Sequence, residues 1–407
     1  MQQRKKLVLT LDFNDEVKSP GDYCTPEDIR AKIAKCRDAG VDRILWRVTC
    51  LGTGAYHSKH LWTADTCDAA DVYDQDWLTA RQKPSVVRNL AVRAAAYRRI
   101  LRHYDPPEVG RDACRAAGIE FYIWWDLFDE WWPGCTGKFL HDNPHHQWIS
   151  RDGHCFRGVR SYAFPESRLD QMPVLDELLA YEPDGLYLCT SCHPCNTRQP
   201  LVEDYYGYES PVAEEFLRRY GVDIRATDDF NKDHWHDLKG EYVTELYRMI
   251  GAKAKAKNIS LLIGTAAERL LHHPNCEDRS IFTAKYTSDW PLLVDRGIAQ
   301  GLSMGDYEEN WRRDNFNRTR LSEPLPAGRL LCEAMPGWFR RIVGNRAELL
   351  IFTGWLSTAQ VPRQLKIFST TTAGLDVDGM ILHEHSTIEG AERGYTHLAA
   401  ARRALDS

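Results

Sequence analysis

The sequence predicts one (β/α)8 barrel, a TIM barrel with long insertions in the loops that follow its strands. Short runs rich in β-branched and aromatic residues alternate with longer amphipathic segments, as in parallel sheets with helical crossovers. Eight such runs occur in 407 residues, enough for a barrel of about 250 residues and its insertions. No linker, repeat or low-complexity tract interrupts the chain, so we expect residues 1–407 to form a single domain.

The expected strands are bounded by recognisable helix signals. In the first crossover Thr25 is a predicted N-cap, Pro26 takes the first helical position, and Ala39-Gly40 ends the helix. The eight strands are expected at residues 6–13, 43–48, 120–127, 185–189, 259–264, 298–304, 349–353 and 379–383. The rival fold, an open doubly wound sheet, is disfavoured because Leu-Asp-Phe-Asn-Asp at 11–15 replaces a glycine-rich phosphate loop.

Composition narrows the range of partners. A net charge of −6 gives no reason to expect nucleic acid or an anionic membrane surface as a partner. No apolar run is long enough to cross a bilayer, and the first residues lack a signal-peptide core. We therefore expect a cytoplasmic protein in preference to an exported one whose signal has been removed. The sequence predicts no oligomeric state.

Aromatic residues are abundant, with 13 Trp and 18 Tyr. Trp124, Trp131 and Trp311 lie near the ends of expected strands. Their flat rings can cover the apolar faces of sugars while hydroxyl groups are hydrogen-bonded at the edges. Core packing is the alternative for each ring. Their clustering near loops favours carbohydrate as the binding partner.

Several segments, taken in order, resemble the glycosyl-hydrolase-like barrel family related to family 10 glycoside hydrolases. They are Ile-Leu-Trp-Arg-Val at 44–48, Gly-Ala-Tyr-His-Ser-Lys at 54–59, Asn-Pro-His-His-Gln-Trp at 143–148, Arg-Asp-Gly at 151–153, Pro-Glu-Ser-Arg at 165–168 and Tyr-Glu-Pro-Asp-Gly-Leu at 181–186. The resemblance covers most of the chain and implies a barrel hydrolase that acts on glycosides.

The fourth expected strand departs from that family. The family commonly has an Asp at the end of this strand, and this sequence has Cys189. Either the catalytic pair lies elsewhere or the protein binds sugar without cleaving it. Cys189 also begins a C-x2-C-x2-C run with Cys192 and Cys195. A zinc site there would need His193 as its fourth ligand, and four metal ligands in so short a segment would be strained. We favour ordinary thiols, or a disulfide if the protein is exported, and expect neither a metal nor a cofactor.

Glycoside hydrolysis normally uses two carboxyl groups that flank the scissile bond, and in a barrel they lie at the C-terminal ends of strands. The predicted catalytic candidates with this placement are Asp126, Asp306, Glu308, Glu309 and Glu384. Residues 305–311 form the densest group, and clustered carboxylates raise one pKa among them, as a general acid requires. Helix caps or ion pairs with neighbouring arginines are the alternative roles.

The predicted substrate-binding residues are Asp12, Arg47, Tyr56, Trp124, Trp131, His193, Trp311 and His383. Arg47 lies in the C-terminal half of its strand, where burial requires that it orders a carboxylate or binds ligand oxygens. An internal salt bridge to Asp12 or Asp126 is the alternative. By strand alternation, His383 and His385 share one face and Glu384 the other, so we expect only one of these sets at the barrel mouth.

These observations predict a glycoside hydrolase that cleaves an oligo- or polysaccharide with a carboxyl general acid and a carboxylate nucleophile or base. A catalytically silent carbohydrate-binding barrel is the first alternative. A metal- or histidine-assisted hydrolase built on the histidine clusters is the second.

Overall fold

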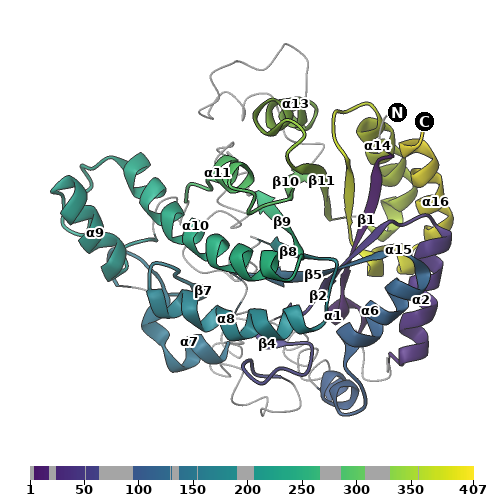
Figure 1. Ribbon diagram of the computed structural model, residues 1–407, viewed down its shortest axis with the longest axis horizontal. Coiled ribbons are helices and arrows are strands. Elements are labelled where there is room, and N and C mark those ends of the chain that lie inside the picture. The colour runs from purple at the N-terminus through teal and green to yellow at the C-terminus, as the bar shows by residue number, and fades with distance from the viewer. Residues whose placement is uncertain are drawn as a thin grey trace.

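The computed structural model describes residues 4–17, 24–50, 52–63, 95–128, 130, 137–153, 155–189, 206–265, 286–307, 331–355 and 357–407. Eight parallel strands close into a barrel at the centre of the molecule, and helices surround it (Figure 1). The predicted (β/α)8 fold is confirmed. The barrel strands, in order around it, are β1 (Lys6–Asp12), β2 (Arg43–Arg47), β5 (Glu120–Asp126), β8 (Gly185–Cys189), β9 (Ser260–Thr265), β10 (Gly301–Tyr307), β11 (Glu348–Trp355) and β12 (Gly379–His383).

Strand alternation explains why these segments form a closed barrel with two buried surfaces. Outward-facing residues such as Leu7, Leu9 and Leu11 of β1 belong to the large core beneath the helices. Inward-facing residues fill the barrel, and glycines make room for the largest of them. At Gly185 a Cβ atom would lie 2.3 Å from the Tyr122 ring, so only glycine fits beside that ring.

The helices follow the strands as the crossover pattern requires. They are α1 (Phe13–Glu16), α2 (Pro26–Asp38), α6 (Pro106–Ala117), α7 (Lys138–Asp142), α8 (Pro165–Ala180), α9 (Ser210–Tyr220), α10 (Lys232–Ala256), α11 (Trp290–Asp295), α13 (Leu331–Val343), α14 (Val361–Ala373), α15 (His385–Gly390) and α16 (Gly394–Leu405), with 3-10 turns η1 (Pro144–His146) and η4 (Thr358–Gln360). The predicted cap of α2 is present, since Thr25 and Asp28 hydrogen-bond each other's backbone N–H groups. Among the described helices none is long and apolar enough to span a membrane.

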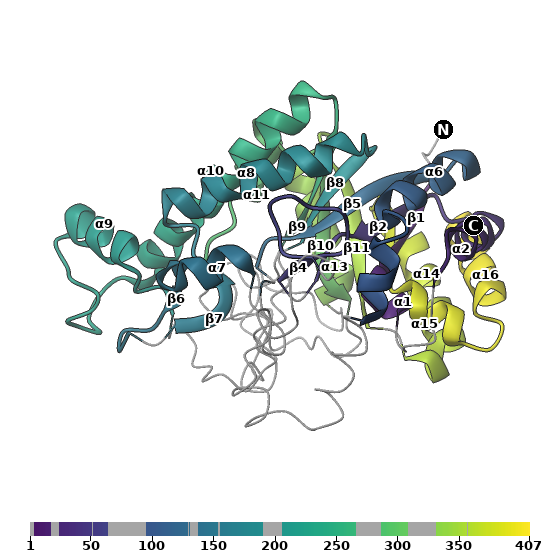
Figure 2. The ribbon, with the colours of Figure 1, turned by 90° about the horizontal axis from the view of Figure 1, so that it is seen from below.

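Two small hairpins occupy loops after the strands. One pairs β3 (Thr49–Cys50) with β4 (Thr53–Gly54), and the other pairs β6 (Gln147–Ile149) with β7 (Cys155–Arg160). The second hairpin lies with α7 and α9 to one side of the barrel in both views (Figures 1 and 2). It belongs to the long insertion expected after the third strand.

The sixth strand differs most from its predicted position. It was predicted at 298–304, and β10 lies at Gly301–Tyr307. Gly297 has a positive φ of 63°, and the backbone N–H of Ile298 donates to the Leu293 carbonyl. Residues 297–299 therefore end the preceding helix. The β-branched Ile298 misled the prediction because it packs against the core from a helix terminus.

The N-terminal ends of the strands, here called the barrel base, are closed by a network of four charged side chains. Arg43 contacts Glu120 at 2.6 Å and Glu348 at 2.7 Å, and Lys6 contacts the same two carboxylates at 2.8 and 3.3 Å. The Arg43 guanidinium also lies 4.0 Å from the centre of the Tyr122 ring. The two cations and two anions balance, so the base is a stabilising element.

Candidate active site

The C-terminal ends of three neighbouring strands bring two carboxylates to one guanidinium. Asp12, Arg47 and Asp126 are the last residues of β1, β2 and β5. Arg47 contacts Asp12 Oδ2 at 2.6 Å and Asp126 Oδ2 at 2.8 Å, and all three side chains are at most 8% exposed. The sequence left a salt bridge to Asp12 or to Asp126 open, and Arg47 makes both. We call this end of the strands the barrel mouth.

An aromatic layer lies directly beneath these charges. Arg47 is 5.0 Å from the centre of the Trp124 ring, and Trp124 contacts Tyr187 of β8 and His383 of β12. Burial raises the pKa of the Tyr187 hydroxyl well above its usual value, which keeps the phenol neutral. The layer separates the polar mouth from the aliphatic interior below. Sequence reasoning did not select Tyr187. The available signal was strand alternation on β8, which places Tyr187 on the same inward face as Cys189.

His383 and Glu384 lie together at the mouth, which corrects the expectation that strand alternation would separate them. The His383 Nε2 atom is 3.9 Å from Glu384 Oε2, and His383 Nδ1 is 2.9 Å from the Thr10 hydroxyl. Alternation fails because β12 ends at His383 and α15 begins at His385. Glu384 is 1% exposed and accepts a hydrogen bond from the Ser386 hydroxyl.

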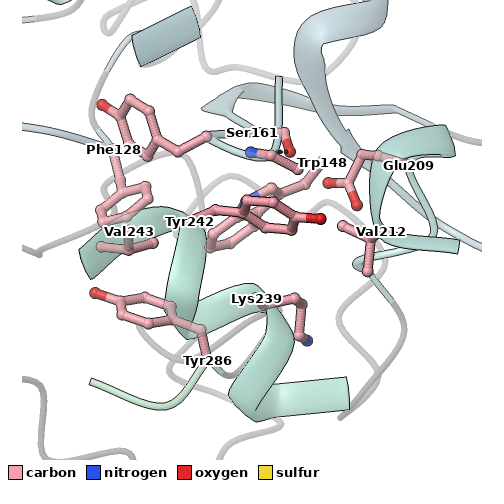
Figure 3. Close-up of a pocket in the computed structure, with 11 residues that line it drawn as sticks. Phe128, Trp148, Ser161, Glu209, Val212, Lys239, Tyr242, Val243 and Tyr286 are labelled. Carbon is pink, nitrogen blue, oxygen red and sulfur yellow. Dashed lines mark hydrogen bonds between the residues drawn. The ribbon is translucent and has the colours of Figure 1, made fainter. Parts of the chain in front are cut away.

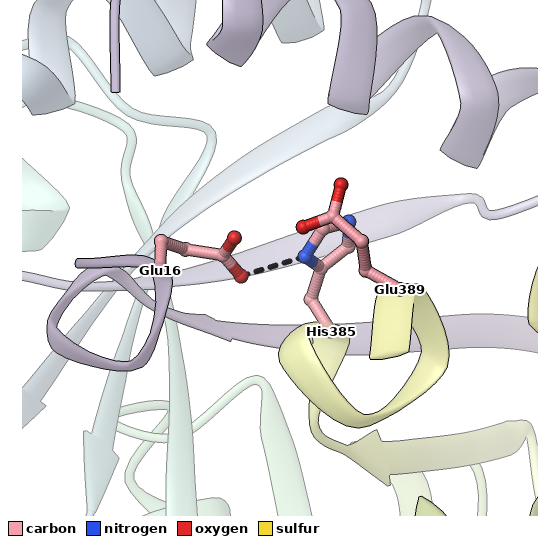
Figure 4. A group of neighbouring side chains, drawn as sticks. All are labelled: Glu16, His385 and Glu389. Atoms are coloured by element: carbon pink, nitrogen blue, oxygen red, sulfur yellow. Dashed lines mark hydrogen bonds and ion pairs between the residues drawn. The ribbon is translucent and has the colours of Figure 1, made fainter. Parts of the chain in front are cut away.

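His385 is directed to a different place, where it forms part of a buried ion-pair network (Figure 4). Its Nδ1 atom is 2.7 Å from Glu16, and Lys32 forms ion pairs with both Glu16 and Glu389. Burial alone would raise the pKa of Glu16, but the charges of His385 and Lys32 outweigh it and lower that pKa to about 2.

Glu16, His385 and Glu389 are also the one group among the described residues with metal-ligand spacing. The Lys32 ammonium already supplies the positive charge between the two carboxylates. Because His385 uses its second ring nitrogen on the Tyr395 hydroxyl at 2.7 Å, the cluster is satisfied as an ion-pair network. It gives no support to a metal-assisted reaction.

Cys189 ends β8 and is paired in register with Asp126. Its thiol is 2% exposed and takes the inward position where the family resemblance implies a carboxylate. The structure therefore places a thiol beside Asp126 at the barrel mouth. Cys192 and Cys195 lie outside the described residues.

Tyr56 has a structural role in place of the predicted contact with substrate. It is fully buried, and its hydroxyl donates to Glu177 of α8 at 3.1 Å. Ser58 and the backbone of Lys59 bind the same carboxylate at 2.7 Å each. Glu177 thus fixes the loop after β2 to α8, and this accounts for the polar residues of that loop.

The remaining candidates are only partly placed. Asp306 lies on β10, and its side chain is not among those described. Five predicted residues lie outside the described residues altogether: Trp131, His193, Glu308, Glu309 and Trp311. The described part of the mouth therefore consists of Asp12, Arg47, Trp124, Asp126, Cys189, His383 and Glu384.

Comparison with solved structures gives likenesses in fold at very low sequence identity. The chain is similar to the catalytic domain of β-amylase from Paenibacillus polymyxa, with a TM-score of 0.54 and 9% identity over 99% of this chain and 98% of the other. It is similar to the endo-1,4-β-mannanase of Rhizomucor miehei, with a TM-score of 0.51 and 9% identity over 99% and 95%.

A third likeness is to α-L-fucosidase isoenzyme 2 from Paenibacillus thiaminolyticus, with a TM-score of 0.52 and 12% identity. It covers 98% of this chain and 49% of the other, so this chain spans about half of that protein. No protein-family model matches the sequence, and no curated protein matches it. At these identities the three likenesses establish the barrel fold.

Proposed function

We propose that this protein is a glycoside hydrolase that cleaves a glycosidic bond in an oligo- or polysaccharide at the barrel mouth. The observation that carries the proposal is the pair of buried carboxyl groups in contrasting surroundings, Asp126 beside Arg47 and Glu384 beside His383 and Ser386. The proposal takes residues 1–407 as one catalytic domain. The three similar barrels, which carry the names of glycosidases, and the resemblance to barrels related to family 10 support it.

The contrast assigns a role to each carboxyl group. A guanidinium in contact favours the ionised form of Asp126, which suits a nucleophile or a general base. Glu384 is 1% exposed beside His383 and Ser386, and burial of a carboxyl group favours its neutral form, which suits a general acid. Arg47 also contacts Asp12, so Asp12 helps to hold the guanidinium in place.

The reaction then follows the usual two-carboxyl scheme. Glu384 gives its proton to the glycosidic oxygen as the bond between that oxygen and the anomeric carbon breaks. Asp126 attacks the anomeric carbon, or takes a proton from the water that does so. Trp124 is buried beneath Arg47, with its ring centre 5.0 Å from the guanidinium, and supports the position of that guanidinium. Asp306, Glu308 and Glu309 remain the alternative members of the pair.

Aryl glycosides with good and poor leaving groups test these roles. Glu384→Gln is expected to lose about 10²–10⁴-fold in rate on a poor leaving group, and much less on dinitrophenolate, which leaves without a proton. Asp126→Asn is expected to lose activity on both. Glu120→Gln, at the other end of the same strand as Asp126, is the matched control and should keep the wild-type rate.

The assignment is wrong if both amide variants keep full activity on a substrate that the wild type cleaves. Amide variants at 306, 308 and 309 would then identify the pair. The order of effects also decides between the two roles, because a general acid is sensitive to the leaving group and a nucleophile is less so.

A carbohydrate-binding barrel without turnover is the second candidate, and Cys189 beside Asp126 is the observation that favours it. A polysaccharide panel distinguishes the two functions. Binding in calorimetry together with release of new reducing ends supports the hydrolase, and binding without such release supports the silent barrel.

A further inference from the structure

A pocket outside the barrel mouth contains a buried carboxylate that the proposed reaction does not use (Figure 3). It lies between the loop after β5, the β6–β7 hairpin, and helices α9 and α10. Its space is about 320 Å³, including the part open to solvent. It is lined by Phe128, Trp148, Ser161, Tyr162, Ala163, Glu209, Val212, Lys239, Tyr242, Val243 and Tyr286.

Glu209 is the unusual member of this lining. It is 1% exposed, and the Ser161 side chain and the Ile149 backbone approach its carboxylate, although neither oxygen makes a hydrogen bond of good geometry within the described part of the chain. A buried acceptor in this state destabilises the fold, and a ligand hydroxyl that donates to it would relieve that penalty. Burial raises the pKa of Glu209 to about 7, despite the nearby ammonium of Lys239.

Lys239 gives the pocket a charge of the opposite sign. Its Nζ atom lies 3.7 Å from the centre of the Trp235 ring, and its side chain is 8% exposed. Figure 3 shows Glu209 and Lys239 on the same side of the pocket with Val212 between them. Because their charges cancel, a neutral ligand with several hydroxyl groups fits better than a simple cation or anion.

Aromatic rings supply the rest of the surface. Phe128 and Tyr162 are buried, whereas Trp148 and Tyr242 are partly exposed. The enclosed part has room for about one water molecule, so it would admit a single hydroxyl group, and the sugar ring itself would rest outside it against Trp148 and Tyr242. Rings combined with a few fixed polar groups are the usual construction of a sugar site.

We propose that this pocket is a second carbohydrate site, which holds one neutral sugar unit with its hydroxyls on Glu209 and Lys239 and its face against Trp148 and Tyr242. The choice of a sugar as occupant rests on the proposed function, whereas the presence of a polar ligand site rests on Glu209 alone. The site would hold a polysaccharide chain beside the barrel mouth without taking part in bond cleavage.

Calorimetric titration with glucose, galactose and mannose tests the pocket, with the Glu384→Gln background used throughout to prevent turnover. We expect at least one of these sugars to bind and Glu209→Gln to weaken its binding about tenfold, the equivalent of one charge-assisted hydrogen bond. Trp148→Ala should weaken binding through the loss of the stacking surface. Glu214→Gln, an exposed glutamate on the same helix as the Glu209 cap position, is the matched control and should leave binding unchanged.

Each result bears on the proposal. Equal binding by Glu209→Gln and Glu214→Gln, or no binding of any of the three sugars, would overturn it. Binding of glycine or phenylalanine without binding of a sugar would also overturn it, because the pocket would then select a zwitterion. Glu209→Gln keeps the size and shape of the side chain, so folding should survive, and an unchanged melting temperature verifies this.

Hydrolysis is measured separately, so the two proposals fail independently. In the catalytically intact chain, Glu209→Gln should leave the rate on a small aryl glycoside unchanged and raise the KM for a polysaccharide. Sugar binding that depends on Glu209, without any hydrolysis, would contradict the proposed hydrolase activity and still support the second carbohydrate site.

Discussion

The two ends of the barrel repeat one arrangement with different outcomes. At each end an arginine of β2 lies over an aromatic ring of β5 and contacts two carboxylates: Arg43 over Tyr122 at the base and Arg47 over Trp124 at the mouth. At the base Lys6 completes a balanced set of charges. At the mouth Asp12 and Asp126 share one guanidinium, and Glu384 follows β12 and lies beside His383. The base is organised for stability, and the mouth is where we propose that the chemistry takes place.

Between the two arginines, the larger effect on activity is expected from Arg47→Lys. A single ammonium cannot make two directed contacts to Asp12 and Asp126 as a guanidinium does, so Asp126 loses its position. Misplacement of a reacting group by about 1 Å costs about 100-fold in kcat/KM. Steady-state kinetics measures this loss. Arg43→Lys is the matched control, and an equal loss of activity in both variants would remove the distinction between the two ends.

The largest effect on stability is expected from Arg43→Met. It leaves Lys6 as the remaining cation of Glu120 and Glu348 in the base network. The free energy of unfolding should fall by about 2–4 kcal/mol. This is less than for a fully buried ion pair, because both carboxylates are partly exposed to solvent. Urea unfolding measures the change. The folded variant should retain the wild-type turnover rate, and a stable but inactive Arg43→Met would contradict the structural role of the base.

A smaller, pH-dependent effect is expected at Glu120. Burial would raise its pKa, but Arg43 and Lys6 outweigh burial and lower it below the usual value. A lowered carboxyl pKa stabilises the fold above the unfolded-state value of about 4.3, and the contribution is lost as the pH falls through the folded-state pKa.

Wild type and Glu120→Gln should therefore differ by about 0.5–1 kcal/mol at neutral pH, a value reduced by solvent exposure. The difference should shrink below about pH 4. Unfolding free energies measured from pH 3 to 8 check this, and a difference that grows on acidification would show that Glu120 is not held by its cations.

The sequence predicts the fold well because alternation and helix caps are local signals. The expected strands at 43–48 and 185–189 lie within a residue of β2 and β8, and Thr25 caps α2 as predicted. The sixth strand shows where local signals fail. Ile298 has a high strand propensity, but it lies at the end of the helix that terminates at Gly297.

The candidate site was predicted less completely, because its contacts depend on which strands become neighbours. Asp12, Arg47 and Asp126 were selected separately, and only the order of the closed barrel shows that Arg47 joins them. Tyr56 was misassigned because its partner Glu177 is far away in sequence. No local sequence pattern marks Glu209 or Lys239. Glu209 is unusual because it is buried, and its burial depends on tertiary packing that the local sequence does not reveal.

The most direct test of the central claim is hydrolysis of a polysaccharide panel by four proteins: wild type, Asp126→Asn, Glu384→Gln and the base variant Glu348→Gln. Release of new reducing ends is measured for each at equal concentrations of folded protein. The account predicts turnover by the wild type and by Glu348→Gln, with loss of about 10²–10⁴-fold in the two mouth variants. Full activity in both mouth variants, or equal loss in all three variants, would contradict it.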